Sequence, residues 1–147
     1  MQNRIALILS VFIVTNAAVA LADPAEIHVY KSPTCGCCAK WIDHLETNGF
    51  SVRTTELADV GPVKRANGVP GNLGSCHTAL VGGYVIEGHV PATDIMRLLK
   101  EKPKIAGLAV PGMPIGSPGM EGPNPERYHV LAFGAGAKLT AFATHGP

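Results

Sequence analysis

The chain has 147 residues, 46% of them hydrophobic, and its 12 Lys and Arg nearly balance its 11 Asp and Glu. No basic patch or run of charge occurs along it, so the composition argues against a nucleic-acid-binding protein. The length is typical of one domain with one hydrophobic core.

The first 22 residues have the pattern of a secretory signal peptide. Arg4 supplies a positive charge, residues 5–14 form an apolar stretch, and Ala-Leu-Ala at 20–22 matches a cleavage site. The apolar stretch is too short for a comfortable membrane span. We therefore expect export, cleavage after Ala22, and a mature domain of residues 23–147 without a membrane span.

The next part of the chain alternates strand and helix patterns. Strands are indicated by alternating apolar and polar residues, and helices by apolar residues three and four positions apart. Gly82-Gly83 predicts a two-residue hairpin. In chain order, the predicted elements are strand 26–31, helix 38–48, strand 50–57, a weaker helix 59–68, strands 78–81 and 84–87, and a helix between Pro91 and Pro103. This order predicts an α/β domain with a thioredoxin-like fold, in which helices flank a mixed central sheet.

A Gly/Pro-rich loop is predicted over residues 107–125, because ten of these 19 residues are Gly or Pro. Such a composition is incompatible with a regular helix or strand. Beyond it, residues 128–133 and 138–142 have strand patterns and are joined by the glycine-rich segment 134–137. We expect this C-terminal hairpin, 128–142, to pack on the main domain, since it is too short to hold a core of its own.

The four cysteines are distributed unevenly. Cys35, Cys37 and Cys38 lie within KSPTCGCCAK, at the start of the first predicted helix, and Cys76 lies two residues before the predicted strand at Thr78. In a thioredoxin fold the loop before the third strand faces the tip of that helix. We therefore expect all four thiols to meet.

Three kinds of chemistry are open to these thiols. In an exported protein, four cysteines form two structural disulfides by default. A C-x-x-C pair at a helix N-terminus instead favours thiol–disulfide exchange, with Cys35 as the nucleophile of lowered pKa and Cys38 as the resolving thiol. However, Cys37 lies between them, and Cys76 stands where thioredoxins place a proline.

Metal binding is the third alternative. Zinc sites usually take their cysteines as two separate pairs, whereas three donors here lie within four residues. That crowding favours thiolates that bridge several ions, and soft thiolates select Cu(I). The pattern therefore favours a multinuclear copper–thiolate site over a zinc site.

Several stretches resemble the CopG-type proteins of bacterial copper-resistance operons, a thioredoxin-like metal-binding family of unknown function. They are YKSPTCGCCAKW at 30–41, GVPGNLGSCHTALVGGYVIEGHVPA at 68–92, GLAVPGMPIGSPGME at 107–121 and YHVLAFGAGAKLTAF at 128–142. The resemblance implies periplasmic copper handling, exchange with other periplasmic copper-handling proteins, and interconversion of Cu(I) and Cu(II). It implies copper ligation by Cys35, Cys37, Cys38 and Cys76. An enzymatic role, as a copper or thiol oxidoreductase, stays open.

Further candidate ligands surround this set. His77 adjoins Cys76, and Met113 and Met120 offer soft thioethers from the Gly/Pro-rich loop. Loop methionines more often fill gaps in a core, so the two could simply cover the site as a lid. We expect His89 to cap or bridge elements and His44 to face solvent.

Overall fold

The computed structural model describes residues 26–134 and 139–147. The predicted signal peptide with its cleavage site after Ala22, and all of the predicted 134–137 connection except Gly134, lie outside the described residues.

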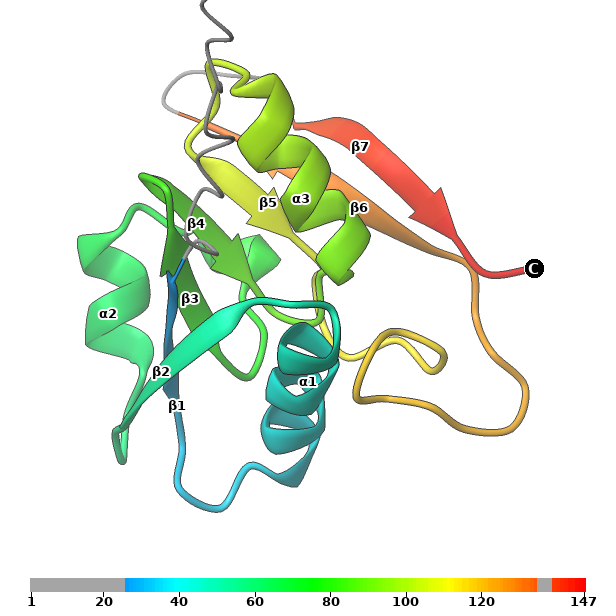
Figure 1. Ribbon diagram of the computed structural model, residues 1–147, viewed down its shortest axis with the longest axis horizontal. Helices are drawn as coiled ribbons and strands as arrows, with labels where there is room; N and C mark the ends of the chain where they lie inside the picture. The colour runs from blue at the N-terminus through cyan, green and yellow to red at the C-terminus, as the bar shows by residue number, and fades with distance from the viewer. Residues whose placement is uncertain (1–25, 135–138) are drawn as a thin grey trace, which may run out of the picture.

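A mixed seven-stranded sheet runs through the molecule in the order β2-β1-β3-β4-β5-β6-β7 (Figure 1). Its strands are β1 (Glu26–Lys31), β2 (Ser51–Glu56), β3 (Thr78–Val81), β4 (Tyr84–Glu87), β5 (Gly107–Ala109), β6 (Tyr128–Phe133) and β7 (Thr140–His145). The pairs β1–β2 and β4–β5 are parallel, and the other neighbours are antiparallel. The predicted thioredoxin-like α/β fold is confirmed.

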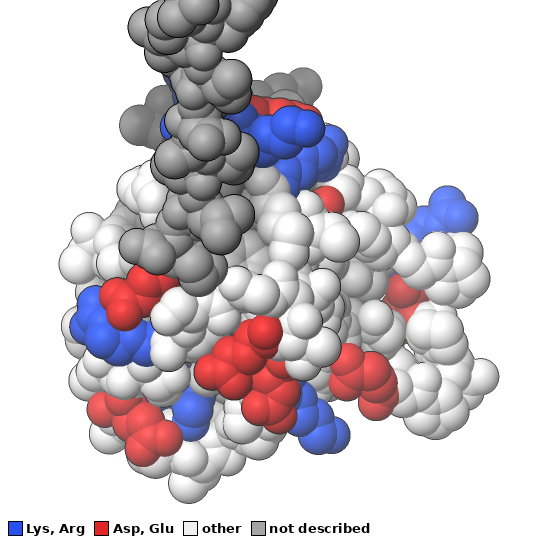
Figure 2. All heavy atoms as spheres, in the orientation of Figure 1, with Lys and Arg blue, Asp and Glu red and all other residues white. Residues whose placement is uncertain are grey.

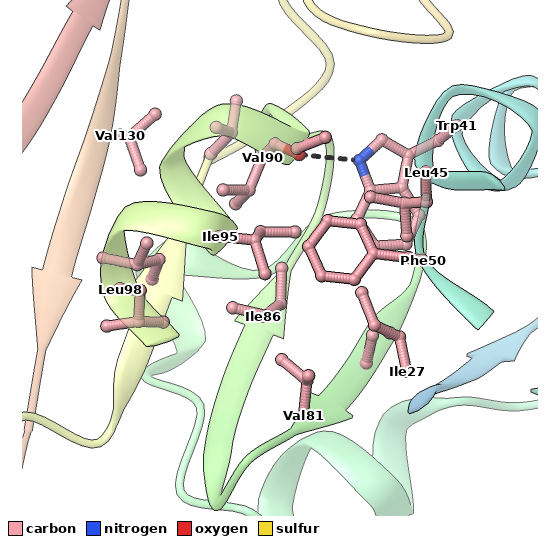
Figure 3. Packing of buried hydrophobic residues seen from close by; sticks show 14 of the residues in the cluster. Ile27, Trp41, Leu45, Phe50, Val81, Ile86, Val90, Ile95, Leu98 and Val130 are labelled. Atoms are coloured by element: carbon pink, nitrogen blue, oxygen red, sulfur yellow. Dashed lines mark hydrogen bonds between the residues drawn. The ribbon is translucent and has the colours of Figure 1, made fainter. Parts of the chain in front are cut away.

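Helices cover both faces of this sheet. They are α1 (Gly36–Thr47), α2 (Gly61–Ala66), α3 (Ala92–Glu101) and the short 3-10 turn η1 (Gly71–Leu73). The larger core lies between the sheet and helices α1 and α3, where Trp41 of α1 and Ile95 of α3 are fully buried (Figure 3). The Trp41 indole donates a hydrogen bond to the Val90 carbonyl at 2.8 Å. This bond ties α1 to the segment that leads into α3.

The other face of the sheet has a smaller core. Leu73 of η1 packs there with Val85, Ala109 and Phe133. Side chains of β4 and β5 alternate between the two cores: Ile86 and Leu108 point to the larger one, and Val85 and Ala109 to the smaller. The apolar residues of these two central strands therefore pack on both faces of the sheet.

The expectation that residues 107–125 contain no strand is wrong at their first three positions. Strand β5 pairs there with β4 and β6. Gly107 permits this close approach, because a Cβ at that position would lie 1.9 Å from the Val85 carbonyl oxygen. The buried Leu108 and Ala109 stabilise the short strand by packing on opposite faces.

The C-terminal hairpin is present, with its second strand at Thr140–His145 rather than 138–142. This register aligns Tyr128 with His145, so that β7 pairs along β6 with one irregularity at Val130/Leu131. The hairpin also contacts α3: the Arg97 guanidinium lies 3.7 Å from the centre of the Phe142 ring. His145 Nε2 lies 2.6 Å from Asp94 Oδ2. These contacts dock the tail on the main domain.

Charges are mixed on the visible surface. On the face drawn in Figure 2, Lys and Arg side chains are scattered among Asp and Glu. Within residues 26–134 and 139–147, no helix has the length and apolar character needed to cross a membrane.

Candidate metal centre

The tip of α1 carries three of the four sulfurs. Cys35 is the N-cap residue, and Cys37 and Cys38 lie in the first turn, because the helix begins at Gly36, two residues earlier than predicted. Cys35 and Cys38 form a disulfide, while Cys37 and Cys76 are free thiols. The described residues, which include all four cysteines, thus contain one disulfide rather than the two of the structural alternative. The lowered pKa expected for Cys35 concerns the reduced form and stays a prediction.

Cys76 reaches the helix tip from the loop before β3, as the fold predicts. Its Sγ lies 3.9 Å from Cys37 Sγ, which in turn lies 3.5 Å from Cys35 Sγ. All four sulfurs lie within 4.8 Å of one another. Cys37 is the central member of this four-cysteine cluster, and its side chain is partly exposed.

Two imidazoles extend the cluster on the side of Cys76. His77 Nδ1 lies 3.3 Å from Cys76 Sγ, and His89 Nε2 lies 3.0 Å from it. His89 Nδ1 donates a hydrogen bond to the Pro118 carbonyl at 2.8 Å, so in the neutral ring Nε2 bears the lone pair that faces Cys76. A backbone carbonyl commonly fixes metal-binding histidines in this way.

His89 was not among the ligands that the sequence predicted, yet the hairpin places it there. Thr78 of β3 pairs with Glu87 of β4. Continuing this antiparallel register by two residues sets Cys76 opposite His89. The two-residue turn Gly82-Gly83 fixes that register, so the signal was present in the sequence.

His77 is fully buried and packs against Trp41, with 4.2 Å between the ring centres and the ring planes tilted by 35°. Burial, together with the nearby His89 and Lys64, holds its pKa well below the usual range, and burial also lowers the pKa of His89. Both rings are therefore neutral near pH 7, the state in which imidazole binds metals. Among the described residues, His77 Nε2 is the buried side-chain nitrogen that lacks a hydrogen-bond partner.

The Cys76 thiol is protonated at neutral pH in the metal-free protein. Burial, and the neighbouring Cys37, raise its pKa to about 11. A metal ion that binds here must displace this proton, because the thiolate is the ligand.

The Gly/Pro-rich loop covers the cluster from outside. Met113 places its sulfur 4.0 Å from Cys37 Sγ and is half exposed. Met120 instead lines a cavity of about 410 Å³ beside Cys37, together with Lys40 and Glu121. The loop lies directly on α1 at Gly119, where a Cβ would meet the Cys37 carbonyl oxygen at 2.6 Å. Of the two predicted methionines, the structure brings Met113 to the cysteines.

The expectation that His44 faces solvent is wrong. Its side chain is partly buried, and its Nε2 accepts a hydrogen bond from the Ala92 backbone N–H at 3.0 Å. The ring thereby caps the N-terminus of α3. His44 thus connects α1 to α3 and lies outside the two groups of clustered donors.

The donors gathered here are soft or borderline. Once the Cys35–Cys38 disulfide is reduced, they comprise the four cysteine sulfurs, the imidazoles of His77 and His89, and the Met113 thioether beside Cys37. Thiolate and thioether ligands favour Cu(I), and imidazole is a ligand of copper and zinc. His77 lies in this group through its Nδ1, 3.3 Å from Cys76 Sγ, while its buried Nε2 has no hydrogen-bond partner. The residues therefore fit a thiophilic metal ion.

Comparisons with known proteins point in the same direction. A family model described as "Protein of unknown function, DUF411" matches residues 73–120. Two solved structures, described as "Copper resistance protein copG", Form 1 and Form 2, each share 44% sequence identity with the chain at a TM-score of 0.79. Each match covers 84% of this chain and 99% of the solved chain. No curated protein matches the chain.

Proposed function

This chain belongs to the family of the copper-resistance protein CopG, and on that premise we propose that it binds copper as its cargo and serves copper resistance. One observation carries the proposal: Cys76 lies within 4.8 Å of the three cysteine sulfurs at the tip of α1. We place the protein in the periplasm, because its first 22 residues have the pattern of an export signal.

We further propose that the ions are Cu(I) and that more than one binds per chain. When reduced and deprotonated by metal binding, the four cysteines supply four negative charges, of which a single zinc ion would neutralise only two. Several monovalent ions, bridged by the central Cys37, match both the charge and the crowding of the sulfurs. Bridging also uses each thiolate more than once, which separated zinc ligands do not require.

The histidines suggest that the site also holds Cu(II). Cu(II) prefers nitrogen and oxygen donors, and His77 and His89 supply neutral imidazoles directly beside Cys76. Interconversion of Cu(I) and Cu(II) would then move one electron between the bound ion and an external partner. Other periplasmic copper-handling proteins are the natural source and destination of the ions.

A second function is supported by the disulfide itself. Cys35 and Cys38 are bonded at a helix N-terminus, which is the arrangement of a thiol–disulfide oxidoreductase. The partly exposed Cys37 lies beside this pair. Binding experiments separate the two functions.

Titration of the fully reduced protein with Cu(I) under anaerobic conditions tests the proposal. We expect more than one copper ion to bind per chain and to displace Zn²⁺ in competition, because all four thiolates are soft donors. Metal analysis after desalting gives the stoichiometry, and optical spectra follow the copper–thiolate bonds. Binding of Zn²⁺ more tightly than Cu(I) would contradict it.

Replacing His89→Asn should selectively weaken Cu(II) binding. The Asn amide nitrogen can still donate to the Pro118 carbonyl from the δ position, but no ε nitrogen then faces Cys76. We expect Cu(II) affinity to fall more than about 10-fold, since even the loss of an outer-shell partner costs that much, while Cu(I) binding changes much less and nitrogen coupling is lost from the EPR spectrum.

The matched control is His129→Asn, which changes an exposed histidine on β6 whose ring bonds to Thr144. It should leave the Cu(II) spectrum unchanged. An unaltered spectrum in His89→Asn would remove His89 from the ligands of the oxidised site.

A further inference from the structure

Glu87, the last residue of β4, is fully buried and has every oxygen engaged. One carboxylate oxygen accepts hydrogen bonds from the Ser75 backbone N–H, at 2.7 Å, and from the Lys64 ammonium. The other accepts from the Thr78 hydroxyl at 2.7 Å. Lys64 also donates to Thr78 at 3.0 Å, so that α2, the loop before β3 and β4 meet at one carboxylate.

These bonds enclose the segment that carries Cys76. Ser75 precedes Cys76 and Thr78 follows His77, so two of the three donors to Glu87 lie on either side of this pair. The Gly88 backbone N–H adds a bond to the His77 carbonyl at 3.1 Å. The Ser75 N–H lies outside the strand ladder, before β3 begins, and Glu87 accepts from it as well as from Thr78, the first residue of β3.

Stability alone does not explain a buried carboxylate at this position. Burial of an ion pair such as Glu87–Lys64 carries a desolvation penalty that is roughly offset by the attraction between the two charges. Apolar residues of similar size often give a protein equal stability. Its geometric effect is distinct, because it fixes where the loop lies relative to α1. The loop must hold Cys76 Sγ 3.9 Å from Cys37 Sγ for the four-cysteine cluster to exist.

We infer that Glu87 is a positioning residue of the copper site, which holds Cys76 in reach of the other three sulfurs without touching the metal itself. This inference rests on the proposed function. Loosening Glu87 should let the Ser75–Thr78 segment move and so weaken the contribution of Cys76, while the three sulfurs on α1 stay in place.

A double-mutant cycle of Glu87→Gln with Cys76→Ser tests this inference on the reduced, full-length mature protein. Cu(I) affinity is measured for the wild type, each single variant and the double variant by competition with a coloured Cu(I) chelator. We expect Glu87→Gln to weaken Cu(I) binding about 10-fold or more when Cys76 is present, as loss of an outer-shell partner does. In the Cys76→Ser background it should have no further effect, because its action passes through Cys76.

Thr78→Val provides a milder second variant, since it keeps the shape of the side chain and removes its hydroxyl, with the bonds to Glu87 and from Lys64, while Glu87 keeps its bond from Ser75. It should show the same dependence on Cys76 with a smaller weakening, and thermal unfolding monitors the fold of every variant. Equal losses of affinity with and without Cys76, or no loss in either background, overturn the positioning role. If Cys76→Ser alone leaves Cu(I) binding intact, this result contradicts the proposed four-thiolate site itself, and the positioning role that rests on it is overturned too.

Discussion

Protein that carries the Cys35–Cys38 disulfide is expected to bind Cu(I) more than about 10-fold more weakly than the same protein after reduction, since even the loss of an outer-shell partner costs that much. Two of the four sulfurs are then bonded to each other and cannot act as thiolates. The remaining pair is Cys37 and Cys76, and the pKa of Cys76, at about 11, makes copper displace a proton. Copper capture would therefore depend on the redox state of the site.

The measurement compares oxidised and reduced protein against one Cu(I) chelator, with thiol counting before each titration. The oxidised form should show two reactive thiols and the reduced form four. A double variant, Cys35→Ser with Cys38→Ser, is the control, because it cannot form the disulfide. This variant should bind Cu(I) weakly, and addition of a reductant should not change its affinity. Equal Cu(I) affinity of the oxidised and reduced wild-type protein would contradict the expectation.

Most of the fold followed from local sequence pattern. The alternation in Glu26–Lys31 and the turn at Gly82-Gly83 predicted β1, β3 and β4 with their observed ends. Strand β5 could not be found this way. A strand of three residues is too short to show an alternating pattern of apolar and polar side chains. Glycine is favoured at Gly107 only because the backbone of β4 lies against it.

The cysteine cluster was predictable because topology, rather than local pattern, places it. Knowledge of a thioredoxin-like order suffices to bring Cys76 to the tip of α1, and the structure shows this meeting. The hairpin register sets His89 opposite Cys76, but the burial of His89 and Glu87 was not predictable, because polar residues near a strand end are usually exposed. Their burial depends on α2, the loop at Pro118 and the hairpin register together, which no single stretch of sequence contains.

The same geometry makes Cys37 the residue that separates the two proposed functions. Its sulfur lies 3.5 Å from Cys35 Sγ, 3.9 Å from Cys76 Sγ and 4.0 Å from the Met113 sulfur. A copper cluster needs this central thiolate to bridge ions across the site. An oxidoreductase that works through Cys35 and Cys38 does not need it.

Cys37→Ser is therefore expected to reduce copper loading from several ions per chain to one or none, and to lower Cu(I) affinity by more than about 100-fold, since a bridging ligand is lost outright. Formation of the Cys35–Cys38 disulfide, and reduction of a disulfide substrate such as insulin, should be unaffected. Anaerobic Cu(I) titration and a turbidity assay on the same preparations measure both properties.

Met113→Leu is the matched control for Cys37→Ser, because it removes the neighbouring sulfur at nearly constant volume. A thioether that is half exposed should contribute less than the central thiolate, so copper loading should fall only slightly. If instead Cys37→Ser retains its full copper stoichiometry, the sulfurs do not act as one bridged group. Cys37 would then lie beside the disulfide pair without binding copper, and thiol–disulfide exchange would be the better account of the site.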